Sequence, residues 1–206
     1  MNLIEKVKFM LLVISSCTLL SCGKDSSLPS DTNSPSISDS TTPVVINEHI
    51  HSSLPVDWIN EYNTIISNLK NLLPLDQTYY NSIDVYAWND KVSAPYPGID
   101  GGAYISVNNN DDNQKLFVIE ISNNEFLWNH IHRYSVIAHE YFHTYQMTLN
   151  RHMNKYDDHP TSFKTKWLTE GAAASFESLY TQQYFNINYF LSGQIKVDSD
   201  TTQTPS

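Results

Sequence analysis

Residues 136–146, with the sequence VIAHEYFHTYQ, constrain the fold of this chain more than any other segment. His139 and His143 are four residues apart, and Glu140 follows the first histidine directly. On an α-helix, residues at this spacing lie about 40° apart around the axis and about 6 Å apart along it, so both imidazoles can reach one metal ion. Glu140 is rotated by about 100° from His139 and would border the ion without binding it. The segment therefore predicts either a metal-site helix or an amphipathic core helix whose histidines have other partners.

The residues around this motif favour a helix from about residue 129 to residue 150. Apolar side chains continue on both sides of it, at Val136, Ile137, Met147 and Leu149, which is typical of a helix with an apolar back. Because two histidines and a glutamate at this spacing also occur by chance, a third ligand is needed to support a metal site.

Glu170 is the candidate for that third ligand, because a catalytic zinc ion needs three protein ligands and one open position. It lies in KWLTEGAAASFES, where we expect it to open a helix from about residue 169 to residue 184. Gly171 and the three alanines after it lack bulk, so this helix could pack closely enough against another for the carboxylate to reach the ion. The alternative is an alanine-rich surface helix with a glutamate that the helix dipole favours at its N-terminus.

The rest of the chain supplies one more helix and three strands. Apolar residues at helical spacing between Pro55 and Pro74 predict the helix. Residues 82–88, 101–108 and 115–122 are typical of strands, and the polar residues between the last two favour a turn. The order of helix, strands and two helices predicts an α+β fold.

The N-terminus has the features of an export signal. Lys6 and Lys8 precede an apolar run at residues 9–20, which is shorter than the roughly 20 residues of a membrane span and suits a signal peptide. The following LLSCG resembles the lipobox of bacterial lipoproteins, which implies cleavage before Cys22 and attachment of a lipid to that residue. Cleavage before Cys17, a plain secretory signal and an uncleaved anchor are the alternatives.

The expected organisation is a signal peptide at residues 1–21, a disordered tether at residues 22–45, one domain at residues 46–195 and a disordered tail at residues 196–206. The tether is rich in Ser, Pro, Asp and Thr and has too little apolar surface to fold. Both cysteines precede the folded part, so this domain has no disulfide and depends on its core, and on any bound metal, for stability.

The net charge of −10 at pH 7 argues against nucleic acid and anionic lipid as main partners, because both select basic surfaces. Membrane attachment would therefore depend on the lipid at Cys22. We expect a monomer that is anchored in the bacterial cell envelope, on the periplasmic face or at the cell surface.

Two segments together resemble the gluzincin metallopeptidases: HEYFH at residues 139–143 and WLTEGAA at residues 167–173. The sequences of these two motifs are most similar to those of bacterial collagenase-type catalytic domains. GGAYIS, which includes Gly102, Ala103 and Tyr104, resembles the glycine-led edge strand that such enzymes place beside the substrate. The resemblance implies a zincin-like fold, in which a small mixed or antiparallel sheet packs its edge strand on an active-site helix and a second helix carries a ligand.

The resemblance also implies a site and an activity. Zn²⁺ would be held by His139, His143 and Glu170, and Glu140 would be the general base. Glu140 would take a proton from a zinc-activated water and return it to the departing amine, so that a peptide or protein substrate is hydrolysed. An extended substrate could add to the edge strand at residues 103–107 through main-chain hydrogen bonds.

The chain departs from the gluzincin pattern in two places. Several gluzincins have an acidic residue one turn after the ligand glutamate that holds a zinc histidine, but here Ala174 stands there. Glu177, two turns after the ligand, could replace it or could be a solvated surface residue. The chain is also short after Glu170, whereas related enzymes continue into a subdomain that supplies the group that stabilises the oxyanion. The candidates for this group are Tyr180, Tyr184 and Tyr189, and the alternative is that they are packing residues.

The remaining histidines are interpreted as bystanders. His130 and His132 are two residues apart near a helix start, where their side chains diverge. His152 and His159 lie in a polar connection. The YDDH stretch at residues 156–159 could bind calcium through its carboxylates, although a solvated loop explains it equally simply.

Three hypotheses follow from the sequence. The first is a lipid-anchored, zinc-dependent peptidase. The second is a binding lipoprotein that zinc stabilises but that has weak or no catalysis. The third is an envelope lipoprotein without enzymatic activity or metal.

Overall fold

The computed structural model describes residues 42–77, 79–108, 111–149 and 162–190. The predicted signal peptide, Cys22, most of the predicted tether, the predicted tail and the polar connection with His152 and His159 lie outside these residues. Residues 42–45, at the end of the predicted tether, hydrogen-bond to residues 75–81. No helix in the described ranges is long and apolar enough to span a membrane.

Four strands form one mixed sheet in the order β1-β2-β4-β3. β1 (Val45–Ile50) and β4 (Asp111–Ile121) both run parallel to β2 (Ser82–Asn89), whereas β3 (Ala103–Asn108) is antiparallel to β4. With the helices that pack on this sheet, the prediction of an α+β fold is confirmed. β3 is an edge strand, which is where the sequence placed a substrate-binding strand.

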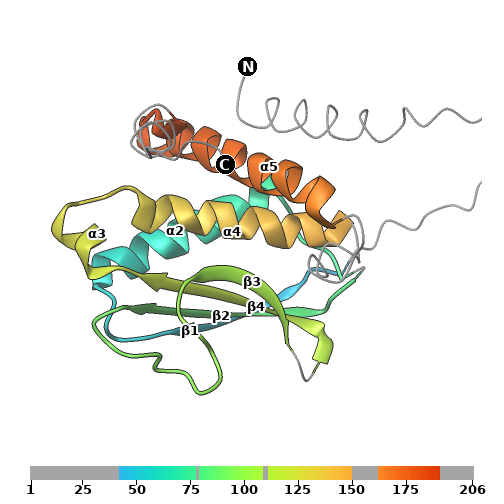
Figure 1. Cartoon of the computed structure of the whole chain (residues 1–206), viewed down its shortest axis with the longest axis horizontal. Coiled ribbons are helices and arrows are strands. Elements are labelled where there is room, and N and C mark those ends of the chain that lie inside the picture. Colours follow the sequence, from blue (N-terminus) through green and yellow to red (C-terminus); the bar gives the residue numbers. More distant parts are fainter. Residues whose placement is uncertain (1–41, 78, 109–110, 150–161, 191–206) are drawn as a thin grey trace, which may run out of the picture. The chain divides into compact units, whose positions relative to one another are not determined.

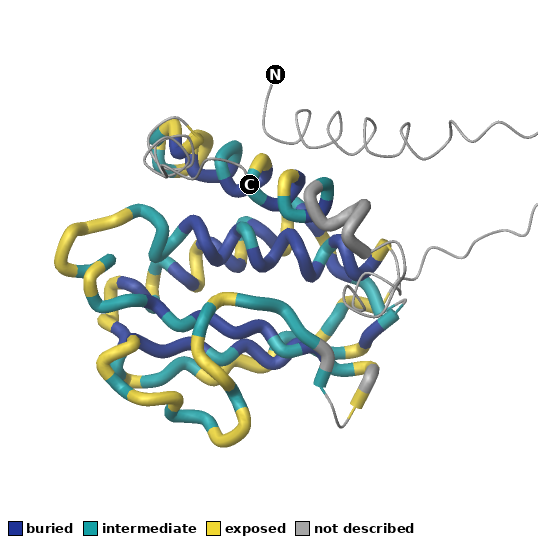
Figure 2. Tube along the Cα trace, viewed as in Figure 1, coloured by how far each residue is buried: buried dark blue, intermediate teal, exposed yellow. Residues whose placement is uncertain are grey.

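The helices form two layers on one face of the sheet (Figure 1). α2 (Val56–Leu72) and α4 (His132–Leu149) cover the sheet, and α5 (Ser162–Phe185) lies on the side of α4 that faces away from it. A short α3 (Asn123–Leu127) connects β4 to α4. Since α4 lies between the sheet and α5, most of its residues are buried (Figure 2), and it is more deeply covered than the one-sided apolar pattern predicted.

α2 forms as its apolar spacing predicts. Trp58, Tyr62, Ile65 and Leu69 recur every three or four residues and are fully buried, so one face of the helix enters the core. Pro55 precedes the helix, where its missing N–H costs nothing. The Trp58 indole donates to the carbonyl of Arg133 at 2.8 Å, which ties the start of α2 to the start of α4.

Three elements differ from the prediction. β1, with the sequence VINEHI, was not predicted because as an edge strand it exposes most of its side chains and shows no alternating pattern. α3 was also not predicted, since five residues are too few for a periodic signal. β4 begins at Asp111, so part of the predicted turn before residue 115 belongs to the strand, where pairing with β3 outweighs the low strand propensity of Asp and Asn.

Candidate metal centre

α4 brings the two histidines of the motif together. His139 and His143 lie one turn apart, and their Nε2 atoms are 3.2 Å from each other. The two rings meet edge to face with their centroids 4.9 Å apart. This is the shared face that the four-residue spacing predicts.

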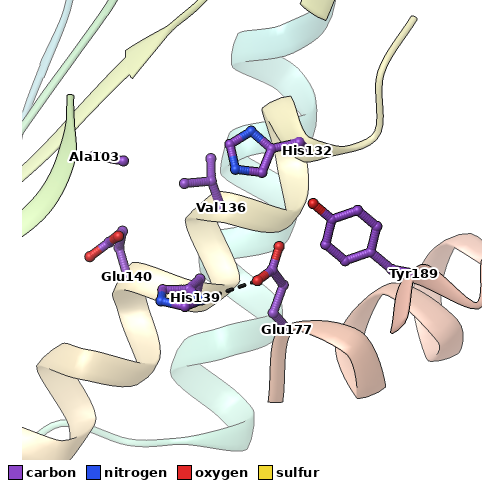
Figure 3. Close-up of a pocket in the computed structure, with 7 residues that line it drawn as sticks. All are labelled: Ala103, His132, Val136, His139, Glu140, Glu177 and Tyr189. Carbon is purple, nitrogen blue, oxygen red and sulfur yellow. Dashed lines mark hydrogen bonds and ion pairs between the residues drawn. The ribbon is translucent and has the colours of Figure 1, made fainter. Parts of the chain in front are cut away.

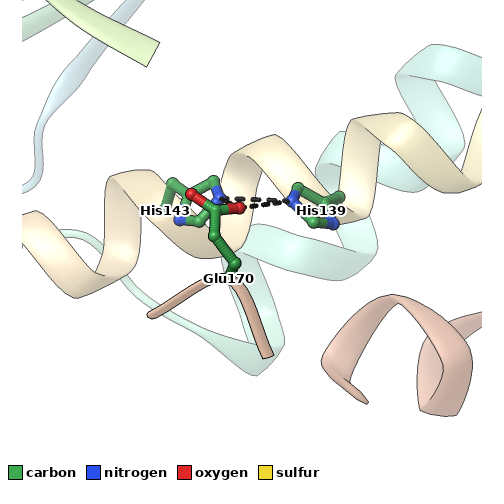
Figure 4. Close-up of side chains that lie close together, drawn as sticks. All are labelled: His139, His143 and Glu170. Atoms are coloured by element: carbon green, nitrogen blue, oxygen red, sulfur yellow. Dashed lines mark hydrogen bonds and ion pairs between the residues drawn. The ribbon is translucent and has the colours of Figure 1, made fainter. Parts of the chain in front are cut away.

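α5 brings Glu170 to the same point (Figure 4). Its Oε2 lies 3.6 Å from Nε2 of His139 and 3.3 Å from Nε2 of His143. One ligand atom from each of the three residues lies within 4.8 Å of the others. The Glu170 side chain is 45% exposed, so the cluster is open to solvent on the side of this carboxylate. The spatial arrangement is the expected one, while metal binding itself stays a prediction.

The way in which α5 carries Glu170 differs from the expectation. The helix begins at Ser162, so Glu170 lies in its third turn and does not open it. Ala172 and Ala173 are buried and permit the close packing on α4. Gly171 does not contribute to that packing, because a Cβ added there would meet no atom within 4 Å.

Glu177 is buried behind the cluster, with 4% of its surface exposed. Its Oε2 accepts from Nδ1 of His139 at 3.0 Å, and its Oε1 accepts from the Ser135 hydroxyl at 2.6 Å. The interpretation of Glu177 as a solvated surface residue is therefore wrong. The resemblance to gluzincins led us to expect an acidic residue one turn after Glu170, where Ala174 stands. Glu177, two turns after Glu170, lies on nearly the same face of the helix and contacts His139 instead.

Gln146 holds the second histidine and was not predicted. Its Oε1 lies 2.8 Å from Nδ1 of His143, and its Nε2 donates to the carbonyl of Thr169 at 3.2 Å. The contact with Thr169 fixes the orientation of the amide, so Oε1 must face the ring as an acceptor. Gln146 lies three residues after His143, so helical spacing was the one sequence signal that could have identified it.

These two contacts fix where the imidazole protons are. If Nδ1 of each neutral ring donates outward, the two Nε2 lone pairs face each other and the carboxylate of Glu170. Three acceptors at 3.2–3.6 Å repel one another unless a cation or a proton lies among them. The cluster therefore has the electrostatics of a cation site.

The pKa values of the two histidines show where a proton goes when no metal is bound. Burial lowers the pKa of His139, but the hydrogen bond with Glu177 and the nearby carboxylates outweigh it and raise the pKa overall. Burial and the neighbouring His139 lower the pKa of His143. A single proton on His139 therefore competes with a metal ion for the site.

Glu140 borders the cluster as predicted, and its residue surface is only 7% exposed. Burial raises the pKa of its carboxyl to about 7, with a further contribution from the charges of Glu170 and Glu177. Nearby His139 acts in the opposite direction. A bound divalent cation would lower this pKa, because it favours the ionised carboxylate.

A pocket of about 300 Å³ extends from the cluster toward the start of α4 (Figure 3). It is lined by Ala103, His132, Val136, His139, Glu140, Glu177 and Tyr189. Of the three predicted substrate-strand residues, Ala103 alone lines it. Gly102 has φ 115° and donates its N–H to Glu120 at 2.9 Å, and Tyr104 pairs with Val118 and does not line the pocket.

The three candidate tyrosines separate clearly. The Tyr180 hydroxyl accepts from Asn68 of α2 at 3.3 Å, and Tyr184 stacks on Tyr180 with ring centroids 4.5 Å apart. Neither lines the pocket: Tyr180 is fully buried, and Tyr184 is exposed. Tyr189 does line it, because the chain leaves α5 through the left-handed Asn186 (φ 54°) and turns back toward the site. Burial raises the pKa of Tyr189 to about 12.

His132 is part of the pocket wall, a position that the sequence did not suggest. The three-residue cluster consists of His139, His143 and Glu170. The distance in sequence between His132 and His139 is seven residues, which is two helical turns and returns to the same face. The expectation that the side chains of His130 and His132 diverge is wrong, because their ring centroids are 6.3 Å apart, although His130 is exposed.

Comparisons with protein-family models, with curated proteins and with solved structures find no match for this chain. The resemblance to gluzincins therefore depends on the two sequence motifs and on how their residues are arranged.

Proposed function

We propose that this protein is a zinc-dependent peptidase of the gluzincin type with a zincin-like domain. The observation that carries the proposal is the convergence of three acceptor atoms, from His139, His143 and Glu170, within 4.8 Å of one another. Both imidazoles have Nδ1 bound to a neighbouring acceptor, which leaves Nε2 free to bind a metal.

The donor set fits zinc. Two imidazole nitrogens and one carboxylate oxygen are the ligands of many catalytic zinc sites, which keep a fourth position open. The exposed side of Glu170 offers that open position. Zinc in such a site polarises a carbonyl group and lowers the pKa of water at the open position to about 7.

Glu140 has the position of a general base. Its carboxylate lies beside the cluster and also lines the pocket. We propose that it accepts a proton from the attacking water and returns it to the amide nitrogen as the carbon–nitrogen bond breaks. Glu177 and Gln146 hold the two imidazoles in the required tautomer and orientation.

β3 supports the choice of a peptide as substrate. It is the last strand of the sheet, and no other described strand pairs with its outer edge. An extended peptide can therefore add to it through main-chain hydrogen bonds. Ala103, at the start of β3, lines the pocket, so such a peptide would pass directly over the cluster.

The proposed setting is the bacterial cell envelope, with the domain anchored as a monomer through a lipid on Cys22. The support for it is the apolar run followed by LLSCG and the polar tether. The membrane is then a partner only through this lipid.

One observation favours the second hypothesis, a zinc-stabilised binding lipoprotein with weak or no catalysis. Tyr189 is the only candidate tyrosine at the pocket, and its hydroxyl is hydrogen-bonded to Ser135. It points toward the space between Glu177 and His132 (Figure 3). Catalysis would then lack an oxyanion donor from these tyrosines.

Metal content and cleavage test the proposal together. We expect one zinc per chain in the purified full-length protein, lost in His143→Ala and kept in the matched control His130→Ala, whose ring is exposed and outside the cluster. Glu140→Gln should keep zinc and lose cleavage of a broad peptide library. A chelator should abolish cleavage by the parent protein, and added zinc should restore it.

The outcomes separate the hypotheses. Zinc without cleavage in the parent protein would favour the binding lipoprotein. Absence of zinc, or equal zinc in His143→Ala and the parent, would overturn the metal site. Equal cleavage by Glu140→Gln would remove Glu140 from the mechanism.

A further inference from the structure

The pocket has a polar end that the proposed chemistry does not use. His132 and His139 are seven residues apart on α4, so they lie on one face at a distance of about 10 Å along the axis. His139 and Glu140 lie at one end of the pocket, and His132 and Tyr189 lie at the other (Figure 3). Between them the wall is formed by the small side chains of Ala103 and Val136 and by the carboxylate of Glu177.

The ring of His132 is held in one orientation. Its Nδ1 lies 2.9 Å from Oε1 of Glu125 on α3. The main chain around Glu125 is fixed by Arg133, whose guanidinium donates to the carbonyls of Glu125 and His130 at 3.3 and 2.6 Å. The other oxygen of Glu125, Oε2, is buried and has no hydrogen-bond partner in the described part of the chain. Glu125 therefore orients the ring of His132 through Nδ1, and Nε2 of that ring is the nitrogen that faces the pocket.

The charged surroundings favour a proton on this ring. The groups that face His132 are Glu125 from α3, Glu177 from α5, His139 and Glu140 from its own helix, and the Tyr189 hydroxyl. The hydrogen bond with Glu125 raises the pKa of His132, against an opposite contribution from burial. Glu177 accepts hydrogen bonds from Ser135 and His139, whereas its interaction with His132 is one of charge alone.

A group that fills this end of the pocket must therefore accept a hydrogen bond from a cationic ring. An apolar side chain would cover the Nε2–H without replacing the water that it displaces. A cationic side chain would be repelled. A carboxylate would form a charge-assisted hydrogen bond and complete an acid–imidazole–acid arrangement with Glu125.

We propose that His132, oriented by Glu125, binds a carboxylate of the substrate at the far end of the pocket. This inference rests on the proposed peptidase function and names its substrate class. Glu125 is a positioning residue in this arrangement, because it acts only through the ring of His132.

The position of the pocket indicates which part of the substrate carries the carboxylate. Ala103, at the start of β3, lines the pocket, so a peptide that pairs antiparallel to β3 runs with its C-terminal part toward His132. At about 3.3 Å per extended residue, about three residues span the distance from the cluster. The carboxylate is then an acidic side chain on one of the first residues after the cleaved bond, or the free C-terminus of a short leaving segment.

Matched peptides distinguish the two sources. In one series, Glu replaces Gln at each of the three positions after the cleaved bond, and all C-termini are amidated. In the other, neutral peptides of decreasing length carry a free or an amidated C-terminus. We expect the zinc-loaded full chain to cleave one class of carboxylate peptide at least about 10-fold more efficiently, mainly through a lower KM.

His132→Asn is the test variant, because its amide nitrogen replaces Nδ1 and can still donate to Glu125, whereas nothing replaces Nε2. The preference for carboxylate peptides should fall to less than about threefold, mainly because the KM for these peptides rises. His130→Asn, a change of the same type at an exposed ring, should keep the preference. Glu125→Gln should also weaken the preference at pH 7.5, because the hydrogen bond that raises the pKa of His132 loses its charged partner.

A binding measurement covers the case of a protein that takes up zinc but cleaves none of the peptides. The monohydroxamates of glutaric, adipic and suberic acid, compared with their neutral amide counterparts, would bind zinc at one end and offer a carboxylate or an amide at the other. Tighter binding of one acid by the parent protein, lost in His132→Asn, supports the inference. Equal affinities, or equal cleavage of acid and neutral peptides, overturn it without touching the metal site. A chain without zinc overturns both proposals.

Discussion

Replacement of Glu140 by Gln should stabilise the metal-free protein at neutral and alkaline pH. In the folded chain, burial raises the pKa of this carboxyl from an ordinary value of 4.5 to about 7. The folded state therefore binds a proton more tightly than the unfolded state does. Linkage then requires that the stability associated with this proton is complete below about pH 4.5 and is lost as the pH rises through about 7.

The size of the effect follows from the two pKa values. At about 1.4 kcal/mol for each pH unit, the difference between 4.5 and about 7 corresponds to about 3 kcal/mol. The residue is only 7% exposed, so solvent screening reduces this little. Because Gln has nearly the same shape and never ionises, Glu140→Gln does not lose this stability at high pH.

Urea unfolding in the presence of a chelator measures the difference between the parent and Glu140→Gln at a series of pH values from 4 to 8. We expect the free energy of unfolding of the variant, relative to the parent, to increase by about 3 kcal/mol across this range, mostly between pH 5 and 7. Saturating zinc should diminish the dependence, because the cation favours the ionised carboxylate. A relative stability that does not vary with pH would refute the reasoning.

Two further substitutions test other parts of the site. Glu177→Gln should lower zinc affinity about 10- to 100-fold in competition with a chromogenic chelator, because the carboxylate that orients His139 loses its charge; unchanged affinity would mean that Glu177 does not tune the site. Gly171→Ala should raise the free energy of unfolding by about 0.5–1 kcal/mol in urea, because a Cβ finds open space in the interior of α5. Its zinc affinity should stay the same, and a loss of stability would contradict the packing described here.

The features that the sequence predicted correctly depend mainly on the spacing of residues along a helix. The spacing of Trp58, Tyr62, Ile65 and Leu69 predicted α2, because helical periodicity is a property of the chain itself. The same rule placed His139 and His143 on one face. Glu170 was a candidate for a third ligand because the residues after it are small, and Ala172 and Ala173 do pack closely on α4.

The features that the sequence left open or missed concern residues whose role depends on elements distant in sequence. Glu177 could be either a support for a zinc histidine or a solvated surface residue, because only the packing of α5 on α4 buries its charge beside His139 and Ser135. His132 reads as a bystander until Glu125 of α3 is brought within 2.9 Å of its ring. β1 shows no apolar alternation of its own, and its strand conformation depends on pairing with β2.

The sequence by itself determined the helix around the motif and the pairing of His139 with His143, because these depend on spacing within about two helical turns. The order of the elements indicated the α+β class, and the small residues after Glu170 indicated the third candidate ligand. The tertiary structure alone decided which polar side chains support those ligands, which tyrosine reaches the pocket and what lies at its far end. Burial and partner contacts arise only when separate elements meet, and burial determines whether a charged side chain remains solvated or becomes part of a site.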